Sequence, residues 1–251
     1  MYSLKISFSI IIASILMISL PMGLLLFWKT KEEERLDRPL TQLALTTAGK
    51  DSLSFSFIAE ALNLSKNQKY SLSHFPLNLA EETLKAYPFI QKIKLSRLPP
   101  NTLLIDYLLR RPIAFIYDWE KMAVDSKGVL FPIDNFYTPK KLPSIFLGYN
   151  INPLNPYSHH LEIDPEELNL IKKIVKSIPH VTLIDLSKKN STHFGQREII
   201  LTISEPQTHL VRLSVDETDL ALKHYLKLMI AKPKLAVVDL RLTHIAYIKE
   251  Y

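Results

Sequence analysis

The side chains best suited to acid-base or metal chemistry lie close together in the second half of the chain, at His159, His160, Asp164, Glu166 and Glu167. Adjacent residues of an extended chain point apart, so His159 and His160 are a poor pair for one metal ion. Asp164 followed by Pro165 and Glu167 is typical of a helix N-terminus, where a capping carboxylate and negative charge are favourable. We therefore interpret these groups as structural.

Catalytic signatures are missing elsewhere. The sequence contains no dinucleotide-binding glycine motif, phosphate-binding loop, nucleophile elbow or HExxH zinc motif. It also contains no cysteine, which excludes disulfides and thiolate metal sites. The net charge of +6 is spread along the chain and forms no dense basic stripe of the kind that nucleic acids need. We predict no catalytic residue, cofactor, metal, nucleic acid or small-molecule substrate.

The elements that position the remaining residues begin with an uncharged apolar run at 6–28. About 20 apolar residues cross a bilayer as a helix, and Trp28 and Lys29 suit its interface. The run is long for a cleaved signal peptide, the main alternative, and no small-residue cleavage site follows it. The sequence predicts a transmembrane helix at 6–28 after a short tail at 1–5, with a charged linker at 29–38.

The charges that flank this run predict an orientation. Lys5 precedes it, whereas Lys29, Lys31 and Arg35 follow it. The positive-inside rule therefore favours, weakly, a cytoplasmic position for the rest of the chain.

Residues 39–113 have the pattern of a small α/β unit. The expected elements are a strand, two helices and a hairpin, at 40–47, 55–62, 76–86, 92–96 and 103–109. Two helices that cover one side of a three-stranded sheet bury a single small core.

Residues 114–251 are richer in strands. We expect helices from Asp164 to about 178 and over about 216–230, the second with Leu222, Tyr225, Leu226 and Met229 inward. The predicted fold class is α+β, with a β-rich mixed sheet in this second domain. The last segment, 240–249, is short and apolar, with no later element to cover it. It either completes the core or offers an edge to which a partner adds a strand.

The order of these features resembles the FtsQ/DivIB family of bacterial cell-division proteins, in which one membrane span precedes a POTRA domain and a β-rich domain. The motifs that carry the resemblance are residues 87–107, Arg110-Arg111-Pro112-Ile113-Ala114, residues 124–131, Leu142-Pro143 with Gly148, and Asp239-Leu240-Arg241. The chain departs from the family at Leu109, where a glutamate is usual, and at Thr243-His244, where a glycine is frequent. Its N-terminal tail is also shorter than usual.

The resemblance implies a non-enzymatic scaffold of the divisome, the assembly that builds septal peptidoglycan. It implies a single-pass type II protein of the inner membrane, with the bulk in the periplasm, against the charge count above. The implied partners are FtsB/FtsL-like coiled-coil proteins and septal peptidoglycan synthase components. Carried over by position, the partner-binding residues are Leu240, Arg241, Leu242, Ile245, Tyr247 and Ile248. A recruitment face on the POTRA domain falls on Leu109, Arg110 and Arg111.

Two alternatives come from other classes. A peptidoglycan-remodelling hydrolase of the envelope needs a cleft with convergent polar groups, which no motif predicts. A POTRA component of a secretion or outer-membrane assembly system shares the first domain but should continue into a barrel or partner module.

Overall fold

A computed structural model of the protein describes residues 21–31, 38–64, 70–133, 137–148, 161–193, 195–231, 234–242 and 244–250. The chain forms two compact units. The first takes in the described residues of 1–48, 53–84 and 93–107, and the second those of 49–52, 85–92 and 108–251.

The predicted transmembrane helix is corrected by this structure. Residues 21–31 are helical, which corresponds to a rise of about 16 Å, roughly half of a bilayer's hydrocarbon thickness. Residues 6–20, the tail at 1–5 and linker residues 32–37 lie outside the described residues. Within the described ranges no helix is long and apolar enough to cross a membrane. The predicted fold class is wrong in this element, and the predicted single-span, inner-membrane location is wrong for the same reason.

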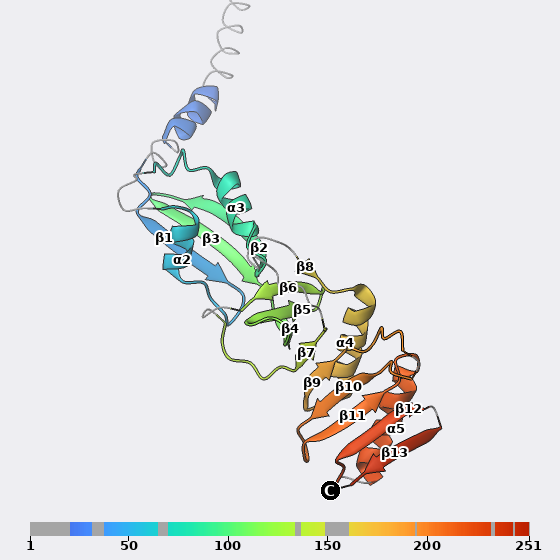
Figure 1. The fold of residues 1–251 in the computed structure, drawn as a ribbon. Helices are drawn as coiled ribbons and strands as arrows, with labels where there is room; N and C mark the ends of the chain where they lie inside the picture. Colours follow the sequence, from blue (N-terminus) through green and yellow to red (C-terminus); the bar gives the residue numbers. More distant parts are fainter. Residues whose placement is uncertain are drawn as a thin grey trace, which may run out of the picture. The chain divides into compact units, whose positions relative to one another are not determined.

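The first unit is built around a three-stranded sheet in the order β1-β3-β2 (Figure 1). Its elements follow the chain as β1 (Gln42–Thr47), α2 (Phe55–Ala61), α3 (Leu77–Lys85), β2 (Ile90–Leu98) and β3 (Thr102–Leu109). The chain positions predicted for the two helices and the hairpin are confirmed. β1 runs parallel to β3, which places residues far apart in sequence side by side. Ile58, Leu84 and Ile105 are fully buried in this unit.

The second unit contains a mixed ten-stranded sheet in the order β13-β12-β11-β10-β9-β7-β4-β5-β6-β8. The strands are β4 (Pro112–Ile116), β5 (Met122–Asp125), β6 (Val129–Pro132), β7 (Ser144–Phe146), β8 (Leu161–Glu162), β9 (Val181–Asp185), β10 (Ile199–Ile203), β11 (His209–Leu213), β12 (Val237–Leu242) and β13 (Ile245–Lys249). The pairs β4–β7, β7–β9 and β11–β12 are parallel, and the others are antiparallel.

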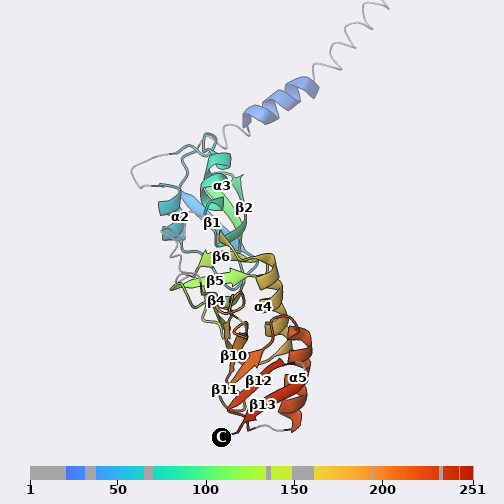
Figure 2. The same cartoon turned by 45° about the vertical axis from the view of Figure 1, so that its right-hand side comes forward.

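Two helices, α4 (Pro165–Ser177) and α5 (Thr218–Ala231), lie on the same side of strands β9–β13 (Figure 2). α4 begins as predicted, because the Asp164 carboxylate accepts hydrogen bonds from the backbone N–H groups of Glu166 and Glu167 at 2.9 and 3.3 Å. In α5, Leu222 and Tyr225 are buried. Leu226 is 39% exposed, so its predicted inward position is wrong.

Alternation along β12 separates two kinds of side chain. Val238 and Leu240 are buried with the core that α4 and α5 cover. Asp239 and Arg241 point to the opposite face, as strand geometry requires. The second unit therefore has an apolar, helix-covered face and a second face on which charged groups can gather.

Candidate functional site

Strand β13 is the last strand of the ten-stranded sheet. It pairs antiparallel with β12, with Asp239 opposite Tyr247 and Leu242 opposite Ile245. In the described part of the chain no strand lies on its other side. Figure 1 shows β13 at the margin of the sheet. An edge of this kind is a template for an added strand, because its outward N–H and C=O groups can pair with another backbone.

The side chains of β13 are more exposed than those of the strands inside the sheet. Ile245 and Tyr247 are 66% and 63% exposed. Ile248 is half-buried and packs against the core. β13 thus contributes one residue to the core and leaves a large aliphatic and an aromatic side chain in solvent, the residue types that anchor protein interfaces.

The three predicted partner-binding residues of β12 differ from one another in burial. Leu240 is 4% exposed and belongs to the core, whereas Leu242, at the end of the same strand, is 66% exposed. Arg241 lies between them on the opposite face, with its side chain 29% exposed. The structure therefore brings Leu242, Ile245 and Tyr247 together at one exposed end of the β12–β13 hairpin, with Arg241 beside them.

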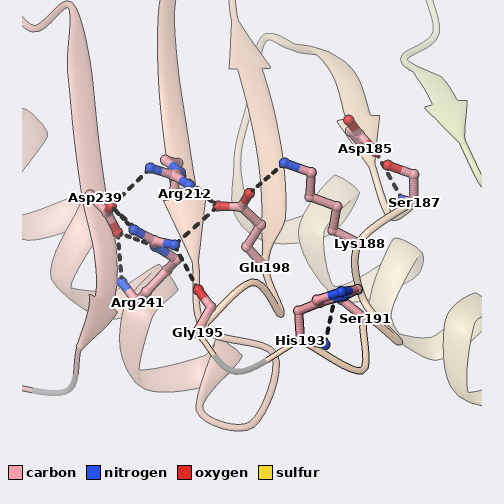
Figure 3. A network of polar contacts seen from close by, with 10 residues as sticks. All are labelled: Asp185, Ser187, Lys188, Ser191, His193, Gly195, Glu198, Arg212, Asp239 and Arg241. Atoms are coloured by element: carbon pink, nitrogen blue, oxygen red, sulfur yellow. Dashed lines mark hydrogen bonds and ion pairs between the residues drawn. The ribbon is translucent and has the colours of Figure 1, made fainter.

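Arg241 is held by a network of charged groups (Figure 3). Its Nη2 lies 2.7 Å from Asp239 Oδ2, and its Nη1 donates to the Gly195 carbonyl oxygen at 3.2 Å. Nη1 is also 3.6 Å from Glu198 Oε2. Arg241 is thus fixed in place by three different residues.

Glu198 is the centre of this network. It is 2% exposed, and its carboxylate accepts from Arg212 Nε at 2.6 Å and from Lys188 Nζ at 3.2 Å. Arg212 also reaches Asp239, at 3.3 Å. A buried carboxylate is tolerated only where cations and hydrogen bonds compensate for lost water. The network joins Glu198, the residue before β10, to Arg212 of β11 and to Asp239 and Arg241 of β12.

The protonation of this network is set by its own contacts. Burial by itself raises the pKa of Asp239. The hydrogen bonds from the side chain and backbone of Arg241, with the charges of Arg241 and Arg212, outweigh burial and hold that pKa below its usual value. The hydrogen bond to Asp239 also raises the pKa of Arg241. Both groups stay ionised at neutral pH, so Asp239 is not a proton donor there, and its lowered pKa makes it a weak base.

A cavity of about 580 Å3 lies between this network and β13. Asp239, Arg241, Leu242, Ile245 and Tyr247 line one side of it, and a loop that includes Ser191, His193 and Gly195 lines the other. Arg197, on the same rim, pairs with Asp216 at 3.3 Å. The edge strand therefore borders a hollow large enough to receive partner side chains.

Glu198, Arg212 and Lys188 were not found by sequence reasoning. A glutamate directly before the apolar strand Ile199–Ile203 is a weak signal that it points into the protein. Nothing in the sequence indicates that Arg212 and Asp239 stand opposite each other, since that pairing depends on the parallel register of β11 and β12.

The three residues of the predicted recruitment face, 109–111, differ from one another in exposure. Leu109 is 4% exposed. Arg110 donates from Nε to the Pro88 carbonyl oxygen at 2.6 Å and from Nη1 to Asp125 Oδ2 at 2.8 Å. Its carbonyl oxygen accepts from the Tyr137 hydroxyl at 3.0 Å. Of the three residues, Arg111 is exposed.

Of the polar residues with which the sequence analysis began, the structure describes Asp164, Glu166 and Glu167. His159 and His160 lie outside the described residues. Asp164 caps α4, and Glu167 is 6% exposed and lies 3.5 Å from Lys189 Nζ. Within the described ranges, no three His, Asp or Glu side chains are grouped so that they could hold a metal ion.

Comparison with known proteins does not name a family, because no protein-family model and no curated protein matches this chain.

Proposed function

We propose that this protein is a non-enzymatic scaffold of the bacterial divisome and binds its partners by strand addition to β13. The observation that carries the proposal is the edge position of β13, with Ile245 and Tyr247 exposed on it. The resemblance to the FtsQ/DivIB family supplies the cell-division context and the partner class, FtsB/FtsL-like coiled-coil proteins and, through them, components of septal peptidoglycan synthesis.

In strand addition the two parts of the edge have different tasks. Main-chain hydrogen bonds along β13 supply affinity that is independent of the partner's sequence. Tyr247 and Ile245 then select the partner, since they border the cavity into which its alternate side chains reach. Asp239, Glu198 and Gly195 already contact the guanidinium of Arg241. Arg241 therefore contributes mainly a fixed side chain that lines the cavity.

The electrostatics of the site support a binding role over hydrolysis. A glycosidase needs one carboxylic acid that stays protonated near neutral pH and a second carboxylate beside it. Here Asp239 has a lowered pKa and two arginine partners, and Glu198 is buried among Lys188, Arg212 and Arg241. With its lowered pKa, Asp239 is therefore not available as a proton donor near neutral pH.

The test is recovery of coiled-coil partners by the full chain, compared between two tyrosine variants. Tyr247→Ser removes the aromatic of β13. Tyr117→Ser removes a tyrosine that is 68% exposed and lies just beyond β4, and is the matched control. We expect Tyr247→Ser to reduce recovery of FtsB/FtsL-like proteins at least tenfold, a loss of about 1.4 kcal/mol, and Tyr117→Ser to leave recovery unchanged.

Backbone pairing is tested in the same complex by amide hydrogen exchange. Protection of β13 amides on addition of the partner is expected from strand addition. Equal loss of recovery in both tyrosine variants, or cleavage of peptidoglycan by the chain without partner recovery, overturns the proposal.

A further inference from the structure

A second cavity, of about 380 Å3, lies on the opposite side of the β12–β13 hairpin, next to α5. We call it the α5 cavity. Its walls come from three elements: His224, Lys227 and Leu228 of α5, Leu240 and Leu242 of β12, and Ile245 and Ala246 of β13, with His244 from the turn. Its volume is within the range of about 300–1,000 Å3 that is usual for binding sites.

The floor of the α5 cavity is apolar. Leu240 is buried beneath it, and Leu228 is half-buried against the core. Leu242 and Ile245, 66% exposed each, stand at its margin. Covering these two side chains with an apolar group removes exposed hydrophobic area from water, which favours binding.

The rim of the α5 cavity carries one cation, Lys227, and two histidines. Among the described residues that line it, His224, Lys227 and His244 are the polar ones, and none is an aspartate or glutamate. Lys227 and His244 are exposed. A ligand that places an apolar group on the floor therefore meets the positive charge of Lys227 at the rim and no described carboxylate, which favours an acidic neighbourhood on the ligand.

We propose that the α5 cavity binds a large apolar side chain from an acidic segment of the same partner that pairs with β13. The inference rests on the proposed function for the partner's position, because Ile245 borders this cavity and the one beside Tyr247. A peptide that crosses β13 can fill both. A second copy of this chain is a poorer occupant, since each copy has a net charge of +6.

The probe is a fluorescein-labelled peptide, Glu-Asp-Leu-Phe-Asp-Glu, titrated with the full chain and followed by fluorescence anisotropy. Two further peptides separate the contributions. Glu-Asp-Ser-Ser-Asp-Glu lacks the apolar anchor, and Lys-Lys-Leu-Phe-Lys-Lys reverses the charge. We expect measurable binding of the first peptide and at least tenfold weaker binding of both others.

Three variants locate the binding. Lys227→Glu reverses a rim charge and Leu242→Ser removes an exposed apolar wall, and each is expected to weaken binding about fivefold to tenfold. Lys141→Glu makes the same charge change at an exposed lysine that does not line the α5 cavity. It is expected to change binding less than twofold.

Several outcomes overturn the inference. They are equal weakening by Lys227→Glu and Lys141→Glu, which indicates general attraction to a basic protein, equal binding of the serine peptide, and no binding of the acidic probe. Binding of the chain to anionic vesicles with release of the bound peptide identifies the site as one for lipid headgroups and also overturns it.

The same variants keep the two proposals apart. Tyr247 does not line the α5 cavity, so Tyr247→Ser should lower recovery of the coiled-coil partner without changing the affinity of the probe. If the partner is recovered through Tyr247 and the probe ignores Lys227 and Leu242, the α5 cavity inference fails and the proposed function stands. If the probe binds as expected but no coiled-coil partner is recovered, the proposed function fails.

Discussion

Two arginine–aspartate pairs of the second unit have the same chemistry and different surroundings. Arg110 and Asp125 meet at 2.8 Å, with side chains 12% and 4% exposed. Arg241 and Asp239 meet at 2.7 Å, with side chains 29% and 16% exposed. The first pair is enclosed by backbone groups, since Asp125 Oδ1 also accepts from the N–H groups of Lys127 and Val129. The second borders a cavity beside the edge strand.

The difference shows how burial decides what a charged residue can do. Arg110 donates hydrogen bonds to Pro88 and Asp125 inside the protein. It therefore stabilises the fold, and its side chain, 12% exposed, has little surface for a partner. Arg241 is also fully engaged, but by groups that keep it at a cavity wall. By its position in the sequence, each arginine was predicted to bind a partner. Of the two, Arg241 lies beside a cavity where a partner can reach it, whereas Arg110 is enclosed.

The largest expected effect is at Arg110. Arg110→Met keeps the side-chain length but leaves Asp125 buried with no cation and the Pro88 carbonyl without its donor. Breaking a buried pair in this way costs about 3–5 kcal/mol. The measurement is the free energy of unfolding in urea. Arg111→Met, at the exposed neighbour, should change it by less than about 0.5 kcal/mol. Similar losses in both variants contradict the assignment of Arg110 to the core.

A smaller effect is expected at Arg241. Arg241→Met removes one of the three cations around Glu198, while Arg212 and Lys188 remain. Because the Arg241 side chain is partly exposed, we expect a cost of about 1–2 kcal/mol in urea unfolding. Arg197→Met breaks a more exposed pair with Asp216 and should cost about 0.5 kcal/mol or less. If Arg241→Met lowers the free energy of unfolding as much as Arg110→Met does, the predicted difference in burial between the two pairs is contradicted.

The smallest expected effect is on acid stability. Burial raises the pKa of Asp239, but the hydrogen bonds and charge of Arg241 outweigh it and lower that pKa. Burial likewise raises the pKa of Asp51, and the hydrogen bonds from Lys140 and Thr138, with the charge of Lys140, outweigh it. Below the unfolded value of about 3.9 the unfolded state then binds more protons than the folded one. The stabilisation is full above that pH and is lost as pH falls through the folded pKa. Unfolding free energies between pH 5 and 2 should fall less steeply for Arg241→Met than for the natural chain.

A comparison with Asp51 sharpens this result. Lys140→Met removes the cation that lies 2.6 Å from Asp51 and should also reduce the slope. Identical slopes in the natural chain and both variants contradict the lowered pKa values.

Much of the local structure was predictable from short stretches of sequence. Asp164-Pro165 predicts the start of α4 because a cap is satisfied by N–H groups two and three residues away. The strand patterns at 92–96 and 103–109 predict the β2–β3 hairpin, whose strands end and begin at Leu98 and Thr102. Alternation of Val238, Asp239, Leu240 and Arg241 predicts which side chains share a face.

Other predictions failed or were absent where distant contacts decide the outcome. Hydropathy over 6–28 predicted a membrane helix that the described residues do not support. Helical spacing placed Leu222, Tyr225, Leu226 and Met229 inward. Leu222 and Tyr225 are buried and Met229 packs against the core, whereas Leu226 is 39% exposed. The Glu198 network required the registers of β10 with β11 and of β11 with β12.

The sequence by itself determined the caps, the turns and the two faces of each strand, because these depend on residues a few positions apart. The tertiary structure alone decided that β13 is one of the two edge strands of the sheet that the described residues form. It also decided that Arg110 is enclosed and Arg241 stands at a cavity. Strand order and register arise from pairings between segments up to dozens of residues apart, and a one-residue shift in register turns every side chain to the other face.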